Sequence, residues 1–169
     1  MNLAARMILI VMAVLASPMV YAMGQAPTGV SDGSLIGKVA YDVSLPLVSG
    51  RHRSIAQSCG NKKAVIFFWA TWCPHCHDEI MRMVQNLDAI TAKGLNIVLV
   101  SEGESKADVA AYLQRNHVPL DSLLDEDSVL QEPYQLEGVP TLFFVDEKGI
   151  IRDVRHGLPD NFVEIFNSK

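Results

Sequence analysis

Two mainly apolar runs stand out along the chain, the unbroken one at residues 64–70 (AVIFFWA) and another at residues 95–101 (LNIVLVS). Each has the length of a β-strand and lacks the polar–apolar alternation of a half-exposed strand. Strands that are buried on both faces, as in the centre of a parallel sheet, show this pattern. The two runs therefore predict two central strands of one sheet.

Apolar residues at helical spacing follow each of these strands. After the first, Ile80, Val84 and Leu87 recur at intervals of four and three residues, and Gly94 marks the end of the helix. After the second, the stretch SKADVAAYLQRNH predicts a helix that Ser105 caps. A closing helix is expected over residues 159–166 (PDNFVEIF).

The remaining strands are shorter or are paired by a turn. Residues 139–157 (VPTLFFVDEKGIIRDVRHG) predict two strands joined at Gly149. Residues 39–48 (VAYDVSLPLV) mix β-branched and aromatic residues with Pro46, which predicts edge strands or a hairpin. After this N-terminal β extension the order is β–α–β–α–β–β–α. It predicts an α/β fold whose βα units give parallel strands and whose hairpin gives an antiparallel edge.

The first 22 residues have the layout of a secretory signal peptide. Arg6 precedes an apolar run of about ten residues, and the small-residue ending VYA predicts cleavage after Ala22. A membrane-spanning helix needs roughly 20 apolar residues, so an uncleaved anchor is the weaker alternative. Residues 23–34 are rich in Gly, Ser and Pro, which predicts a flexible linker, and one domain is expected over residues 35–169.

The charge balance argues against two classes of partner. The chain of 169 residues has 14 Lys and Arg against 19 Asp and Glu, a formal charge of −5. Without residues 1–22, which hold Arg6 and no acid, 13 basic residues face 19 acidic ones and the charge is −6. Nucleic acid and anionic membranes both select clustered Lys and Arg. We therefore expect no nucleic acid partner, and membrane contact only if the signal segment stays uncleaved.

Two of the three cysteines, Cys73 and Cys76, form a CPHC motif where the first buried strand meets its helix. Such a pair is a structural disulfide, half of a metal site or a reactive dithiol. A disulfide across two residues constrains the unfolded chain very little, which disfavours the structural role. Zinc needs further ligands at fixed spacing that the sequence lacks, whereas Cu(I) suits two thiolates and stays open. We expect a dithiol that works without cofactor or metal.

The position of Cys73 favours the reactive dithiol. Pro74 fits the first helical position, so Cys73 faces the free N–H groups and the positive end of the helix dipole, which together lower the pKa of a thiol. His75 adds a possible donor to the same sulfur. Cys76 is then the resolving thiol, one turn further in. Trp72 either lines a peptide groove or packs into the core.

In these motifs the chain resembles the thioredoxin fold and, within it, the exported TlpA/ResA/CcmG-like branch. Residues 68–76 (FWATWCPHC) are similar to the branch's W-C-x-x-C active site, and residues 125–157 to its stretch through a Gly-Val-Pro-Thr turn into the last strands. Glu79 matches an acidic residue that the branch carries three positions after the second cysteine. The resemblance spans roughly residues 36–166.

This resemblance implies a thioredoxin-like fold, with a central mixed sheet flanked by helices. It implies a cis bond before Pro140, which faces the CPHC motif, and a backbone at Val139 that pairs with an extended substrate. It also implies exchange with protein thiols and disulfides, together with an upstream redox partner. Glu79 lies at i+3 from Cys76, hence on the same helix face, where a carboxylate could take the proton of that thiol.

Some positions depart from the family pattern. The Pro-His dipeptide between the cysteines more often accompanies the oxidant DsbA, although this chain lacks DsbA's long helical insertion. Phe67 stands where thioredoxin has a buried Asp, which leaves Glu79 as the nearby acid of the motif. Cys59 matches no family position. We expect it to be exposed near the start of the first buried strand, too far from the motif for a disulfide, and to form dimers when oxidised.

The sequence thus predicts a monomeric thiol–disulfide oxidoreductase, exported to the bacterial periplasm, that reduces disulfides there, in cytochrome c maturation or copper-site assembly. A DsbA-like oxidant is the alternative within the same chemistry. A Cu(I)-binding chaperone without turnover is the alternative from a different class. A peroxidase of the peroxiredoxin type is disfavoured, because a CxxC pair rather than a lone cysteine occupies the helix start.

Overall fold

A computed structural model of the chain describes residues 34–161. Its centre is a five-stranded mixed sheet in the order β5-β4-β3-β6-β7. The strands are β3 (Ala64–Trp69), β4 (Asn96–Glu102), β5 (Ser122–Asp125), β6 (Thr141–Val145) and β7 (Ile151–Arg155). β4 pairs in parallel with β3 and β5, whereas β6 is antiparallel to both β3 and β7. The predicted parallel centre and antiparallel edge are therefore confirmed.

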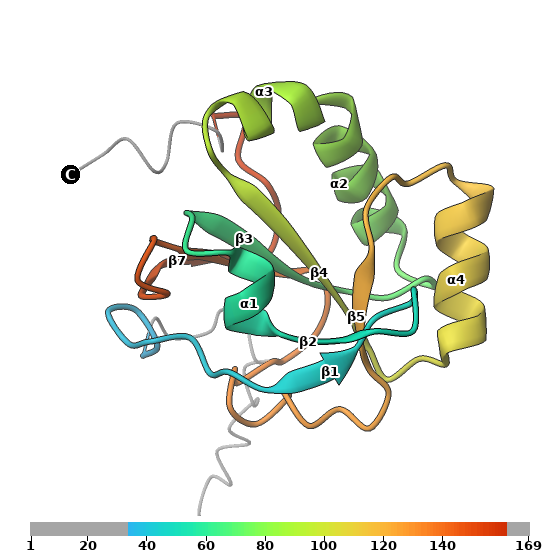
Figure 1. Cartoon of the computed structure of the whole chain (residues 1–169), viewed down its shortest axis with the longest axis horizontal. Coiled ribbons are helices and arrows are strands. Elements are labelled where there is room, and N and C mark those ends of the chain that lie inside the picture. Colours follow the sequence, from blue (N-terminus) through green and yellow to red (C-terminus); the bar gives the residue numbers. More distant parts are fainter. Residues whose placement is uncertain (1–33, 162–169) are drawn as a thin grey trace, which may run out of the picture.

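Helices cover both faces of this sheet (Figure 1). They are α1 (Ile55–Cys59), α2 (Pro74–Gln85), α3 (Leu87–Ala92) and α4 (Lys106–Arg115). Buried side chains of α2, α3 and α4 share one hydrophobic cluster, and those of α1 belong to another. The sheet separates these two clusters, so the molecule has three layers.

The alternation of side chains along β3 builds both clusters. One face of the strand contributes Val65, Phe67 and Trp69 to the cluster under α2 and α4. The opposite face contributes Ala64, Ile66 and Phe68 to the cluster under α1. All six residues are buried, as expected for a central strand covered on both faces.

The N-terminal β extension is a short antiparallel pair of β1 (Ser44–Pro46) and β2 (His52–Ser54). Isolated bridges join this N-terminal segment to the main sheet, from Leu47 to Leu123 in β5 and from Val39 to Ile150, the residue before β7. The extension thus spans the face of the sheet that α1 covers. The predicted extension is confirmed.

The predicted order missed two elements, β5 and α1, and joined two helices into one. The helix expected to run to Gly94 is interrupted at Asn86, which ends α2 and precedes α3. The side-chain Nδ2 of Asn86 donates to the carbonyl of Arg82 at 2.8 Å. An Asn side chain that bonds the backbone in this way competes with the helical ladder, which explains the break.

Three predicted segments fall outside the description. The signal peptide over residues 1–22 and the linker over residues 23–34, apart from Ser34, precede the described residues. The closing helix over residues 159–166 extends past residue 161, the last one described.

Candidate active site

The CPHC motif lies where β3 ends and α2 begins. The backbone N–H of Cys73 donates to the carbonyl of Ala70 at 3.2 Å, which closes a turn with Thr71 and Trp72 at its centre. Cys73 is the N-cap of α2, and Pro74 opens the helix. A proline is well tolerated at this position because its missing N–H would have no partner within the helix. The turn and the helix start together fix the position of Cys73.

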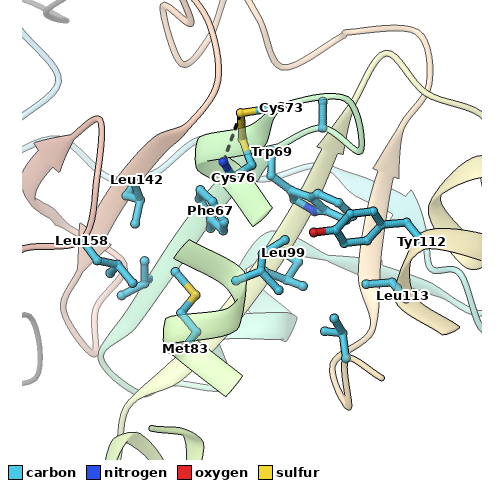
Figure 2. Close-up of a cluster of buried hydrophobic side chains, with 14 of the residues drawn as sticks. Phe67, Trp69, Cys73, Cys76, Met83, Leu99, Tyr112, Leu113, Leu142 and Leu158 are labelled. Carbon is cyan, nitrogen blue, oxygen red and sulfur yellow. Dashed lines mark hydrogen bonds between the residues drawn. A yellow bond between two sulfur atoms is a disulfide. The ribbon is translucent and has the colours of Figure 1, made fainter. Parts of the chain in front are cut away.

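The two cysteines of the motif are joined by a disulfide, with their Cα atoms 5.2 Å apart. The backbone N–H of Cys76 donates to Sγ of Cys73 at 3.1 Å (Figure 2). Cys73 is 5% exposed, whereas Cys76 is fully buried at 0%. The sulfur of Cys73 is therefore the more accessible of the two. When the pair is reduced, the same N–H and the positive end of the α2 dipole favour a thiolate at Cys73.

The loop before β6 faces the sulfur of Cys73, which is the outer sulfur of the pair. The carbonyl oxygen of Val139 lies 3.7 Å from Sγ of Cys73. The Val139–Pro140 peptide bond is cis, as the family resemblance implies. On the far side of the loop, Nδ1 of His156 lies 3.1 Å from the carbonyl oxygen of Pro140. The end of β7 thus supports the loop that lies against the motif.

Two side chains beside the motif project from the surface. Trp72 is 71% exposed, the largest fraction among the exposed large hydrophobic side chains in residues 34–161. The alternative that Trp72 packs into the core is therefore wrong, and its ring is free for apolar contact next to Cys73. His75 is also exposed, so any interaction of its ring with the Cys73 sulfur is screened by solvent and salt.

Glu79 lies half-buried on α2, with 15% of its side chain exposed. Its carboxylate forms an ion pair with Arg82 at 3.0 Å. Arg82 also donates to the carbonyl of Leu158 at 2.8 Å, so the pair joins α2 to the segment after β7. Gly157 lies against the same carboxylate, because a Cβ at that glycine would be 3.2 Å from Oε1 of Glu79. The structure thus places Glu79 in an ion pair beneath the C-terminal segment.

The interior behind the motif is apolar. Phe67 is fully buried in the same cluster as Cys76, where Figure 2 shows its ring deep to the disulfide. Leu142 and Met83 belong to this cluster as well. No acid occupies the position of Phe67, as the sequence indicated. The inner thiol is therefore surrounded by hydrocarbon, which disfavours its thiolate form.

A contact that the sequence analysis missed lies on the motif's own turn. The carboxylate of Glu104, in the loop after β4, accepts the backbone N–H of Thr71 at 2.7 Å. Its other oxygen accepts the Thr71 hydroxyl at 2.5 Å. The sequence could have indicated this contact. β3 and β4 are both expected to be central parallel strands, and the carboxyl ends of such strands meet at one edge of a sheet. Acids just after the second strand are thus brought to the motif.

Cys59 differs from its prediction. It is only 6% exposed and belongs to the cluster under α1, on the sheet face opposite Cys73 and Cys76. Burial, and to a smaller degree the charge of Asp42, raises the pKa of the Cys59 thiol to about 11. The expectation of an exposed thiol is therefore wrong, because the missed helix α1 folds Cys59 inward, and the expected dimer through Cys59 loses the exposure on which it was based. Cys59 is a free thiol, in line with the prediction that it does not pair with the motif.

The described residues contain neither a metal-binding cluster nor a membrane-spanning helix. Within residues 34–161, no group of three or more His, Cys, Asp or Glu side chains is arranged to hold a metal ion. In the same part of the chain, no helix has the length and apolar character needed to cross a bilayer.

A dithiol at the start of the helix that follows a central strand, with a cis-proline loop against its outer sulfur, places this molecule among thioredoxin-like proteins. The profile of the AhpC/TSA family matches residues 36–154. The chain is 33% identical to thioredoxin-like protein YneN of Bacillus subtilis over 124 residues. This aligned region covers 72% of this chain and 71% of that protein.

Two further comparisons agree with this placement. The chain is 32% identical over 130 residues to thiol:disulfide interchange protein DsbE of Pseudomonas fluorescens, covering 76% of this chain and 71% of that protein. The thioredoxin domain of a thiol-disulfide oxidoreductase from Bacteroides vulgatus has the same fold, with a TM-score of 0.69 at 23% identity over 78% of this chain and 95% of that one.

The chain belongs to the AhpC/TSA family and, within it, to the TlpA/ResA/CcmG-like thiol–disulfide oxidoreductases. The predicted thioredoxin-like fold and the predicted enzyme class are therefore confirmed.

Proposed function

We propose that this protein is exported to the periplasm and reduces disulfides of other exported proteins through the Cys73–Cys76 pair. The observation that carries the proposal is the asymmetry of the two sulfurs. The outer sulfur caps α2 and accepts the N–H of Cys76, while the inner sulfur is fully buried among apolar side chains. One thiol is thus suited to attack and the other to resolve.

The exchange has two steps. In the first, the Cys73 thiolate attacks one sulfur of a substrate disulfide, the substrate S–S bond breaks, and the departing thiolate takes a proton from solvent. In the second, Cys76 loses its proton and attacks the Cys73 sulfur. The Cys73–Cys76 disulfide forms, and the second substrate thiol leaves. Two electrons pass to the substrate, and an upstream thiol reductant restores the dithiol.

Glu79 is the group we assign to accept the Cys76 proton, since it lies one helical turn further along α2 and Phe67 supplies no acid. The ion pair with Arg82 keeps this carboxylate in place. Trp72 and the backbone of Val139, before Pro140, flank the outer sulfur and form the surface on which an extended substrate segment would lie.

The signal-like residues 1–22 and the names of the relatives support the cellular setting. One relative is a thiol:disulfide interchange protein DsbE, and another is a thiol-disulfide oxidoreductase ResA. The resemblance to the TlpA/ResA/CcmG-like branch favours substrates such as apocytochromes c or copper-site proteins. We propose that the protein acts as a monomer and without a metal or cofactor.

The deciding experiment is the reduction potential of the motif, measured by equilibration with thiol–disulfide buffers and paired with insulin reduction. A reductant is expected to have a potential below about −200 mV, whereas a DsbA-like oxidant lies near about −120 mV. Cys59→Ser should reduce insulin as the wild type does, and Cys73→Ser should be inactive. Stoichiometric Cu(I) binding by a protein without turnover would replace the enzyme with a copper chaperone.

The rate at which the mixed disulfide on Cys73 is resolved tests the second step. Glu79→Gln keeps the shape of the side chain but loses the base, so the mixed disulfide formed by Cys73 should persist longer while the protein stays folded. Asp78→Asn, an exposed acid next to Glu79 in α2, is the matched control and should resolve at the wild-type rate. Equal resolution rates for the two variants between pH 6 and 9 would remove Glu79 from the mechanism.

A further inference from the structure

The turn that presents Cys73 is bound from outside by one carboxylate. Thr71 is a central residue of that turn, and both of its donors, the backbone N–H and the hydroxyl, go to Glu104 at 2.7 and 2.5 Å. A carboxylate that accepts two donors fixes both the position and the orientation of the group it binds. Thr71 and Glu104 are 33 residues apart, so this is a tertiary contact between two loops.

The loop that carries Glu104 is itself held at both sides. On one side, the backbone N–H of Gly103 donates to the carbonyl of Asp125 at 2.9 Å. On the other, the backbone N–H of Lys106 donates to the carboxylate of Glu126, also at 2.9 Å. Glu104 is thus presented to the active-site turn from a fixed support on β4, β5 and α4.

We propose that Glu104 is a positioning residue for thiol exchange. By binding Thr71 it holds the turn so that the sulfur of Cys73 stays at the start of α2, where it accepts the N–H of Cys76, and Trp72 stays at the surface. The proposal rests on the assignment of Cys73 as the attacking thiol. Glu104 accepts both of its hydrogen bonds from Thr71 rather than from either cysteine, so it acts on Cys73 through Thr71.

Charge and geometry make opposite predictions for this residue. As a bare negative charge, Glu104 would oppose the Cys73 thiolate, so its removal would lower the pKa of Cys73. As a clamp, it keeps the sulfur where the helix start stabilises the thiolate, so its removal raises that pKa. Glu104→Gln removes the charge and keeps an acceptor for the Thr71 N–H, whereas Glu104→Ala removes both. The pair of variants therefore separates the two effects.

The experiment measures the pKa of Cys73 by iodoacetamide labelling in a Cys59→Ser/Cys76→Ser background, and kcat and KM for insulin reduction in the intact enzyme. Glu104→Ala should raise the pKa of Cys73 by about one unit, hence about tenfold less thiolate below that pKa, and should lower kcat/KM several-fold. Glu104→Gln should stay within about a third of a unit of the wild type. Thr71→Val keeps the hydrogen bond from the backbone N–H, so it should raise the pKa of Cys73 less than Glu104→Ala does. In the double variant Thr71→Val/Glu104→Ala, the pKa of Cys73 should be close to that of Glu104→Ala alone.

Asp127→Ala is the matched control, because this exposed acid is next in sequence to Glu126, whereas Thr71 and Lys106 donate to Glu104 and Glu126. If Glu104→Ala lowers the melting temperature but leaves the Cys73 pKa unchanged, as it is in Asp127→Ala, the role of Glu104 is structural only and the proposal falls. Equal downward shifts in Glu104→Ala and Glu104→Gln would reduce it to a charge effect and also overturn it. A wild-type Cys73 that titrates as an ordinary thiol would instead refute the proposed function.

Discussion

The two ends of β3 place a cysteine in opposite settings. At the carboxyl end, Cys73 caps the start of α2, accepts an N–H at 3.1 Å and has the exposed Trp72 as its neighbour. At the amino end, Cys59 is the last residue of α1 and is buried on the other face of the sheet. There Asn96 donates to the carbonyl of Cys59 at 3.0 Å.

The difference shows that helix polarity and solvation, rather than the presence of a thiol, decide reactivity. A helix start presents free N–H groups and positive potential, which favour a thiolate, whereas a helix end presents carbonyl groups. Burial opposes the charged form in either place. Cys59 has both unfavourable features, and the nearby Asp42 adds a third. We therefore expect one sulfur of this chain to be suited to exchange and another to react slowly.

The largest expected effect is the difference in labelling rate between these two thiols. Cys73 alone (in Cys59→Ser/Cys76→Ser) and Cys59 alone (in Cys73→Ser/Cys76→Ser) should be treated with iodoacetamide across pH 5 to 10. With a pKa of about 11 for Cys59, and about 7 or lower for a thiol like Cys73, the thiolate fractions at pH 8 differ on the order of several hundredfold.

Labelling in denaturant is the control for this comparison, and there the two thiols should react alike. Rapid labelling of folded Cys59 at pH 8 would show that α1 opens or that the burial of this residue is misassigned. A Cys73 that titrates near the free-thiol value of about 8.5 would remove the helix start as a source of reactivity.

These contrasts also show which parts of the molecule the sequence could predict. The apolar run of β3 and the proline after Cys73 are local signals, and they located the motif at the right end of the right strand. Ser105 likewise predicted the start of α4, where its side chain accepts the N–H of Asp108.

What could not be predicted depends on contacts between distant segments. The strand β5 has only four residues and begins with a polar one, so its pattern is weak, and its pairing with β4 makes it a strand. The capping box of Ser54 and Gln57 in α1 is a readable signal, but its consequence, the inward turn of Cys59, is tertiary. The bond from Thr71 to Glu104 is of the same kind.

A smaller effect is expected when His75 is replaced. This variant distinguishes the contribution of the α2 N-terminus to the stability of the Cys73 thiolate from that of the neighbouring imidazole. His75→Ala should raise the pKa of Cys73 and make the couple more reducing, by about 30 mV for each 1.4 kcal/mol of thiolate stabilisation lost. Because His75 is exposed, the shift should shrink at high salt. His117→Ala, an exposed histidine after α4, is the control, and an unchanged potential in His75→Ala would assign thiolate stabilisation to the helix alone.

The smallest expected effect concerns a group of the active-site end that lowers stability rather than reactivity. Glu102 ends β4 beside Asp125, and its Oε2 is buried without a hydrogen-bond partner. Burial, together with the charge of Asp125, raises the pKa of Glu102 from 4.5 to about 7, although a bond from Ser128 opposes the shift. The folded protein therefore keeps a proton on Glu102 that the unfolded chain has already released.

The ionisation of Glu102 makes the free energy of unfolding depend on pH. Below pH 4.5 Glu102 is protonated in both states, and above pH 7 it is ionised in both, so its contribution changes only between these values. Between pH 4.5 and about 7 the folded state binds more protons than the unfolded chain. The free energy of unfolding therefore falls as the pH rises through this range. Glu102→Gln resembles the protonated side chain and cannot ionise, so it should remove this part of the decline. Urea unfolding at pH 4.5, 6 and 7.5 measures it, with Glu126→Gln as the exposed control. If Glu102→Gln loses stability across the window as steeply as the wild type, Glu102 does not hold the proton, and the active-site end is no more strained than the end that buries Cys59.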